Sequence, residues 1–253
     1  LFATTDHRGT ELWRTDGTPG GTSRVGPGFA SAPCWLTVFD GRVYFGADGG
    51  NGSGIELWRY DPALGAVSLV ADLWPGGQGS NPAELTVLDG RVLFHAYSAA
   101  NVEQLWQSDG TSAGTSALTS FAVSSRIRDI TRASTRVIFG AGPAEELWAS
   151  DGTIAGTARV GTLTFGGVGG TLGISGGVLF QSIGRCTRFD DAPWVTDGTP
   201  AGTYLLRDDL ETGDFFEPFG FVDFNGLGVF NGSDGNDRRL WRSDGTPAGT
   251  TLI

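Results

Sequence analysis

The chain of 253 residues contains no lysine and no methionine, and it has only two cysteines and two histidines. Arginine supplies all 17 basic residues against 28 acidic ones, which gives a formal net charge of −11. An acidic chain of this kind lacks the basic stripe that binds a phosphate backbone, so we expect no nucleic-acid partner. We draw no function from the missing lysine and methionine.

The rare residues exclude further kinds of site. Cys34 and Cys186 allow one disulfide or two separate thiols, and they have no metal-ligand spacing. His7 and His95 fall in different repeats, which argues against a zinc site. No apolar run approaches the ~20 residues of a membrane helix, so we expect no membrane insertion. No Walker loop or H-E-x-x-H motif is present, and we lean toward a protein that is not an enzyme.

Glycine, in contrast, is abundant at 42 residues, and one phrase of a dozen residues returns along the chain. It reads ELWRTDGTPGGT at 11–22, QLWQSDGTSAGT at 104–115, ELWASDGTIAGT at 146–157, PWVTDGTPAGT at 193–203 and LWRSDGTPAGT at 240–250. Its tryptophans, with one more in a diverged copy, are Trp13, Trp58, Trp106, Trp148, Trp194 and Trp241. The successive spacings of 45, 48, 42, 46 and 47 residues are typical of solenoids or propellers.

A phenylalanine precedes each of these tryptophans in the same order: Phe2, Phe45, Phe94, Phe139, Phe180 and Phe230. Within one unit, residues 82–118 contain four short apolar runs separated by glycine and Asp-Gly. Runs of this length predict strands, which we letter A to D, and the glycine and Asp-Gly residues between them predict tight antiparallel turns. Four such strands form one propeller blade.

The repeated phrase covers strand C and the turn to strand D. Its Asp, Gly and Thr residues suit a turn in which the carboxylate caps the backbone and glycine adopts a positive φ. In the second copy the turn has become YDPALGAVSL at 60–69, while Glu56, Leu57 and Trp58 persist. We therefore interpret the phrase as a scaffold joint, and the Phe and Trp columns as packing between neighbouring blades.

The ELWxxDGT pattern resembles the bacterial ELWxxDGT-repeat proteins, and the resemblance runs through all six Trp-centred motifs. The order of each unit is also similar to that of WD-repeat propellers. The resemblance implies an exported protein that is extracellular or at the cell surface, and it implies no particular chemistry.

The number of predicted strands indicates how many blades the chain forms. Strands B, C and D occur six times, and strand A five times, at 36–39, 85–88, 130–133, 172–175 and 221–224. We expect an all-β, six-bladed β-propeller of four antiparallel strands per blade, in which the first blade lacks its innermost strand. We expect one domain over 1–253, a monomeric part of a longer parent chain, with units 1–31, 32–80, 81–125, 126–165, 166–214 and 215–253.

The loops fall on two faces. The A–B and C–D turns, on one face, are short and uniform, whereas the B–C and D–A loops, on the other, vary. A repeat scaffold binds ligands on its variable face, so we expect any ligand there. The alternative is that these loops vary because nothing constrains their sequence. The candidate ligand residues on this variable face are Trp35, Trp74, Glu84, His95, Asp129, Phe215 and Phe216. Each has an alternative without a ligand: Trp74, Phe215 and Phe216 cover a blade edge, Trp35, Glu84 and Asp129 line a channel that holds only water, and His95 is a packing residue.

Cofactors are not expected, but two loops rich in oxygen atoms offer weak calcium candidates in Asp48, Asn51, Glu56 and Asp234. We predict a non-enzymatic binding or adhesion module whose partner is a glycan or another cell-surface protein. One alternative is a carbohydrate-active enzyme that uses carboxylates at the channel mouth, for which the candidates are Glu84, Asp129, Asp190, Asp191 and Glu217. The other alternative is a purely structural spacer.

Overall fold

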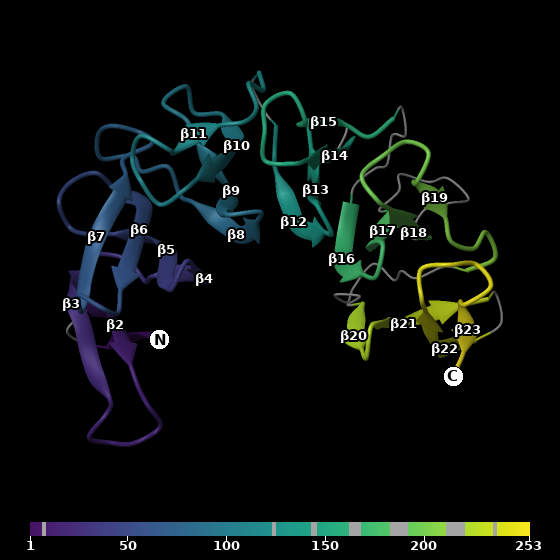
Figure 1. Ribbon diagram of the computed structural model, residues 1–253, viewed down its shortest axis with the longest axis horizontal. Helices are drawn as coiled ribbons and strands as arrows, with labels where there is room; N and C mark the ends of the chain where they lie inside the picture. The colour runs from purple at the N-terminus through teal and green to yellow at the C-terminus, as the bar shows by residue number, and fades with distance from the viewer. Residues whose placement is uncertain are drawn as a thin grey trace. The chain divides into compact units, whose positions relative to one another are not determined.

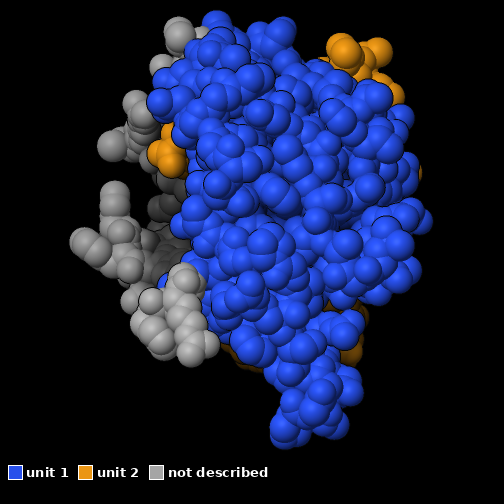
Figure 2. All heavy atoms as spheres, turned by 90° about the vertical axis from the view of Figure 1, so that its left-hand side faces the viewer, with its two compact units in different colours: residues 1–123 blue, residues 124–253 orange. Residues whose placement is uncertain are grey.

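The computed structural model describes residues 1–6, 9–122, 125–142, 146–161, 168–182, 192–210, 221–234 and 237–253. The chain divides into two compact units, Leu1–Val123 and Ser124–Ile253, which are coloured separately in Figure 2. The regular structure of the described residues is entirely β, in 23 strands (Figure 1). None of these residues forms a helix with the length and hydropathy of a membrane span.

Unit 1 contains three antiparallel sheets. The first has three strands, β1 (Phe2–Asp6), β2 (Gly9–Arg14) and β3 (Ser23–Phe29). The second has β4 (Cys34–Phe39), β5 (Arg42–Asp48), β6 (Ile55–Asp61) and β7 (Ala66–Ala71). The third has β8 (Ala83–Leu88), β9 (Arg91–Tyr97), β10 (Glu103–Ser108) and β11 (Ser116–Ala117).

Unit 2 contains three sheets of four strands each. They are β12 (Arg128–Ala133), β13 (Arg136–Ala141), β14 (Glu146–Ser150) and β15 (Ala158–Arg159); then β16 (Val168–Ile174), β17 (Gly177–Ser182), β18 (Pro193–Thr196) and β19 (Tyr204–Leu205); and last β20 (Val222–Phe224), β21 (Leu227–Ser233), β22 (Arg238–Ser243) and β23 (Thr251–Leu252). In every sheet the strands lie in chain order, so the predicted order A to D is confirmed, including the three-stranded first sheet. We call these sheets blades 1 to 6.

The two aromatic columns meet within each blade. The Phe of strand B lies directly opposite the Trp of strand C in all six, as in the pairs Phe2–Trp13, Phe94–Trp106 and Phe230–Trp241. The spacing of the sequence motifs therefore reflects a fixed strand register. A slip by one residue would move every one of these side chains to the opposite face of its sheet.

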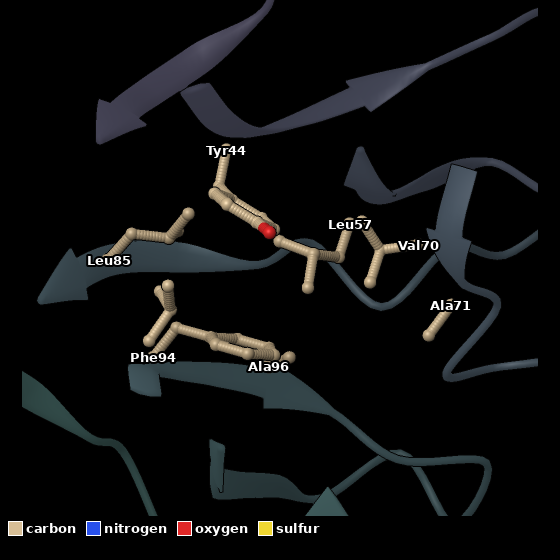
Figure 3. Close-up of a cluster of buried hydrophobic side chains, with 8 residues drawn as sticks. Tyr44, Leu57, Val70, Ala71, Leu85, Phe94 and Ala96 are labelled. Atoms are coloured by element: carbon tan, nitrogen blue, oxygen red, sulfur yellow. The ribbon is translucent and has the colours of Figure 1, made fainter. Parts of the chain in front are cut away.

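The core lies between successive blades. At the junction of blades 2 and 3, Leu57 of strand C packs toward Leu85 and Phe94 of the next blade, together with Tyr44 and Val70 (Figure 3). Three further clusters join blades 1 and 2, blades 4 and 5, and blades 5 and 6, and each contains the Phe of strand B from the later blade. At these four junctions the Phe and Trp columns pack between blades as interpreted, through Phe45, Phe94, Phe180 and Phe230 and through Trp58, Trp106, Trp194 and Trp241. Phe2, in the first blade, is exposed instead.

The A–B turns are two-residue hairpins. In the pairs Asp40-Gly41, Asp89-Gly90 and Asn225-Gly226 both residues have positive φ, which is the conformation of a type I′ turn. In blade 5 the sequence pattern predicts the turn at Gly176-Gly177, but this is wrong by one residue, because Gly177 already pairs with Ile174 and the turn is Ser175-Gly176. The run of two glycines does not reveal which of them belongs to the strand.

The repeated DGT phrase forms the same hydrogen-bond network in five C–D turns. In blade 3, Asp109 Oδ1 accepts hydrogen bonds from the amide and hydroxyl of Thr111 at 2.8 and 2.7 Å. The Thr111 hydroxyl oxygen accepts from the Gly114 amide at 3.0 Å, and its carbonyl accepts from the Thr115 hydroxyl. Equivalent Asp–Thr bonds recur at Asp16, Asp151, Asp197 and Asp244.

The later glycine of this turn is required by space. A Cβ added at Gly114 would lie 2.1 Å from the Asp109 carboxylate, and the other four turns show the same clash. The phrase is thus a self-contained turn whose polar groups are used internally, which supports its interpretation as a scaffold joint.

Candidate functional site

The innermost strands carry an irregularity that the sequence did not suggest. In blades 2 to 5 the register of strand A against strand B shifts near the start of strand A, between Cys34 and Thr37 in blade 2 and at equivalent places in the others. The residue at the shift has positive φ: Trp35 (+57°), Glu84 (+54°), Asp129 (+59°) and Gly170 (+55°). These β-bulges lie at the end of strand A that follows the variable D–A loop.

Glycine adopts this left-handed conformation without strain, but three of the four bulges use a residue with a side chain. The left-handed region costs a non-glycine residue roughly 1–2 kcal/mol, and it is unusual for a residue as bulky as tryptophan. The spacing of the repeats aligns Thr171 with this column, but the strand register assigns the position to Gly170. A bulge re-aims the side chain it carries, and strained residues of this type cluster at functional sites.

Two of the bulges are tied together in unit 1. The Thr37 hydroxyl lies 3.1 Å from the carbonyl oxygen of Trp35 in its own blade and 3.0 Å from that of Leu85 in the next. Leu85 adjoins Glu84, so Trp35 and Glu84 are carried by neighbouring inner strands that the same hydroxyl bridges. In unit 2 the equivalent Thr131 hydroxyl bonds to the hydroxyl of Thr171 in the following blade.

Trp35 stands out among the described aromatic residues of the variable face because 51% of its surface is exposed. Glu84, in the next blade, is half-buried and makes contacts of its own within the protein. Asp129 occupies the same bulge in unit 2 and is also half-buried. An exposed indole can stack on an apolar ligand face, and a carboxylate on the neighbouring strand can accept hydrogen bonds from a ligand.

Trp74 is less exposed than its neighbourhood of proline and glycine suggested. It is half-buried in the D–A loop, which a buried carboxylate holds in place. Glu56 accepts hydrogen bonds from the Leu73 amide at 2.9 Å, the Ser80 amide at 2.8 Å and the Ser80 hydroxyl at 2.6 Å. Burial raises the pKa of Glu56 above its ordinary value, and these hydrogen bonds oppose the rise.

The glutamate or glutamine of the ELW phrase has two roles. In blade 3, Gln104 holds its D–A loop as Glu56 does, through the Phe121 amide and the Thr119 hydroxyl, each at 2.8 Å. In blade 1 the equivalent Glu11 instead pairs with Arg24 of strand D at 2.8 Å. The sequence shows that a glutamate or glutamine recurs at this position. It does not reveal the partners of these side chains in the D–A loops, because most of the partners are backbone amides.

His95 lies beside an acidic partner. Its Nδ1 atom is 3.1 Å from Glu103 Oε1, in an orientation that forms no directed hydrogen bond, and both side chains are nearly buried. This arrangement fits a packed histidine that pairs with Glu103 when protonated. In blade 2 the same position is Gly46, where an added Cβ would lie 2.8 Å from the Pro82 carbonyl.

The calcium candidates are engaged in local contacts. Asp48 accepts from the Gly50 amide, Asn51 accepts from the Ser53 amide and hydroxyl, and Asp234 pairs with Arg239. Within the part of the chain that the structure describes, no three Asp, Glu, His or Cys side chains converge as metal ligands.

Some predicted residues lie outside the described ranges. They are Phe215, Phe216, Asp190, Asp191, Glu217, His7 and Cys186. Cys34 is a free thiol whose pKa is raised by burial, and its Sγ lies 3.6 Å from the Gly46 carbonyl oxygen.

One catalytic-looking motif is explained by the fold. Residues 110–114, GTSAG, match the letters of the G-x-S-x-G nucleophile motif. They form a C–D turn between β10 and β11, rather than the strand-to-helix elbow that exposes a nucleophilic serine. The match is therefore a by-product of the repeat.

Comparisons with known proteins concern the fold. No family model and no curated protein matches the sequence. Among solved structures, puromycin hydrolase is similar over 99% of this chain and 42% of its own, with 14% identity and a TM-score of 0.55. TolB from Acinetobacter baumannii is similar over 95% of this chain and 58% of its own, with 14% identity and a TM-score of 0.51. Kuenenia stuttgartiensis hydrazine synthase is similar over 96% of this chain and 41% of its own, with 11% identity and a TM-score of 0.50.

The chain thus spans between 41% and 58% of the length of these solved chains. Identities this low carry no function across, but the shared arrangement of antiparallel sheets agrees with the six blades. The protein is a β-propeller domain, with one three-stranded and five four-stranded blades.

Proposed function

We propose that this propeller domain is a non-enzymatic binding module, exported from the cell, that takes a glycan at the inner-strand bulges of its variable face. The observation that carries the proposal is Trp35, a tryptophan that is 51% exposed and held in a left-handed bulge where glycine would fit without strain. A strained and exposed aromatic residue contributes little to folding, so a role in recognition accounts for it.

The scaffold supports the proposal in two ways. The uniform face uses its polar groups internally in the DGT turns, which leaves few of them for a ligand. On the variable face, Glu56 fixes the loop that carries Trp74, and Thr37 fixes the bulge that carries Trp35. Side chains on such supported positions bind without a large loss of conformational entropy.

A glycan array probed with the wild-type domain, with and without calcium, tests this function. We expect binding to a defined set of glycans that is lost in Trp35→Gly, a substitution compatible with the left-handed backbone. Leu64→Ser is the matched control, because Leu64 is an exposed residue in the C–D turn of the same blade, and it should bind as wild type does.

Other outcomes would point elsewhere. Cleavage of a bound polysaccharide would favour the carbohydrate-active enzyme, with Glu84 among its candidate carboxylates. An array without any binding would contradict the proposal and favour a structural spacer.

A further inference from the structure

Blade 6 exposes a sheet face that the earlier blades bury. In blades 1 to 4 the leucine of the ELW phrase is fully buried, as at Leu57 and Leu147, whereas Leu240 of blade 6 is 45% exposed. Two apolar residues of the inner strand β20 accompany it, Val222 with 61% and Phe224 with 64% of their surface exposed. Apolar side chains that gather in this way on one element mark a surface that binds another protein surface.

The three side chains share one face of the blade. The strand register places Val222 opposite Val229, and it places Leu240 opposite Asn231, which is two residues further along the same strand. Residues two apart in a strand lie on the same side of a sheet, and so does Phe224, two residues after Val222. The other side of the sheet packs against blade 5 through Phe221, Phe230 and Trp241. The exposed residues, which we call the Leu240 face, are therefore on the side away from blade 5.

The junctions between described blades show what covers such a face. At the junction of blades 2 and 3, the face with Leu57 and Tyr44 packs against Phe94 and Trp106 of the later blade. The junctions of blades 1 and 2, 4 and 5, and 5 and 6 also use the Phe and the Trp of the later blade. The surface complementary to the Leu240 face is thus a blade side that carries these two aromatic residues.

A polar contact of the junction also has its counterpart in blade 6. In blade 2, Arg59 donates through Nε to the Ser68 hydroxyl at 3.3 Å and through Nη1 to the Gly110 carbonyl of the next blade at 2.8 Å. Arg242 follows the strand-C tryptophan of blade 6 as Arg59 does in blade 2, and its Nε donates to the Thr251 hydroxyl at 3.2 Å. An incoming blade with a DGT turn offers Arg242 the carbonyl that Arg59 finds at Gly110.

Blade 1 presents a matching surface. Phe2 is 39% exposed, although the strand-B phenylalanine is buried in each of blades 2 to 6. Trp13 lies directly opposite Phe2 and therefore on the same side of the sheet, which we call the Phe2 face. Blade 1 also contains a DGT turn, in which Gly17 holds the place of Gly110. It thus has the aromatic pair and the turn carbonyl that the Leu240 face requires.

We infer that the Leu240 face of one copy of the domain binds the Phe2 face of a second copy, so that copies associate head to tail. The contact is heterologous, because two different surfaces meet, and each added copy leaves one face of each kind open for the next. The sequence alone predicts a monomer, since it does not show that these faces are exposed. The association uses the sides of the blades, so it is independent of glycan binding at the variable face.

Sedimentation velocity of the wild-type domain over a range of concentrations tests the association. The mean mass should rise with concentration past that of a dimer. Phe224→Asp and Phe2→Asp each place an unpaired charge in the contact, so each should weaken association at least about tenfold. Leu240→Asp is a second variant of the blade 6 face, in case Phe224→Asp does not fold. Ile154→Asp is the control, because Ile154 is exposed in the C–D turn of blade 4, and it should associate as wild type does.

A mixture of the two kinds of variant tests whether the contact is head to tail. Phe224→Asp keeps an intact Phe2 face, and Phe2→Asp keeps an intact Leu240 face. An equimolar mixture should therefore form dimers with one copy of each variant and no larger species. A symmetric contact between two Leu240 faces would instead let Phe2→Asp dimerise by itself.

A wild-type domain that stays monomeric at every concentration would overturn the inference and show that these faces have another occupant. Association of Phe2→Asp alone as strong as that of wild type would also overturn it, and so would a mixture of the variants that forms no dimer. Equal weakening by Ile154→Asp would show that charge, rather than either face, controls association, and would count against it. Each of these results leaves the proposed glycan-binding function intact.

Discussion

The strain assigned to the inner-strand bulges can be measured by comparing two small residues at Trp35. At an ordinary strand position glycine is less stable than alanine by about 0.5–1 kcal/mol, because it loses more backbone entropy on folding. At φ +57° the alanine Cβ instead costs roughly 1–2 kcal/mol, which glycine avoids. The difference reverses the order, so Trp35→Gly should be about 0.5–1 kcal/mol more stable than Trp35→Ala.

Equilibrium denaturation in urea is a suitable assay, because both variants lose the same indole and its packing contribution cancels in the comparison. The slope with denaturant should be equal for the two variants, so that the difference lies in the midpoint. Val38, which is 70% exposed in the same strand and has an ordinary backbone, is the control position, where alanine should be the more stable. An alanine variant at position 35 as stable as the glycine variant, or more so, would refute the strain.

The loops and turns give three further predictions. Glu56→Ala leaves the Leu73 and Ser80 donors without an acceptor, so it should cost about 1–3 kcal/mol and speed hydrogen exchange at residues 73–80. Gly114→Ala should destabilise blade 3 in urea denaturation, and Asp109→Ala should relieve part of that loss because it removes the clashing carboxylate; simple additivity of the two variants would contradict this explanation. The Thr111 side chain lowers the pKa of Asp109, so the stability gap between wild type and Asp109→Ala should be present at neutral pH and narrow as pH falls below the ordinary aspartate pKa of about 4.

The opposite pH trend belongs to Glu56. Its pKa is raised by burial, so its carboxyl favours the folded state while it is protonated. That stabilisation is present below the ordinary glutamate pKa and is lost as the pH rises through the raised value. The two groups therefore pull the pH dependence of stability in opposite directions.

Much of the fold could be predicted because the repeated residues define the strand register. The positions of Phe94 and Trp106 hold a Phe and a Trp in every unit. Only a fixed pairing of strands B and C places such residues opposite each other six times. The hairpin at Asp89-Gly90 could be predicted from these two residues alone, because few dipeptides adopt two positive φ values. These signals depend on neighbours in sequence.

The candidate site depends on partners far away in sequence, and there the prediction was less complete. The bulge at Trp35 is defined by a register shift against β5 and held by Thr37, and neither can be seen in residues 34–37 alone. The glycine-rich surroundings of Trp74 left open whether it is exposed or covers a blade edge, because its loop is held by Glu56, which is distant in sequence. The residue type of Trp35 suggested binding, and the strand register supplied the physical reason.

We propose that Trp35 presents its indole to a glycan on the variable face. The most direct measurement is an NMR titration of the eight tryptophan indole N–H signals with a glycan selected on the array, with the Trp35 signal assigned by its absence in Trp35→Gly. We expect the Trp35 signal to shift progressively with ligand, while the signals of the strand-C tryptophans that pack between blades, Trp58, Trp106, Trp194 and Trp241, stay in place. A Trp35 signal that does not move while the glycan binds would contradict it.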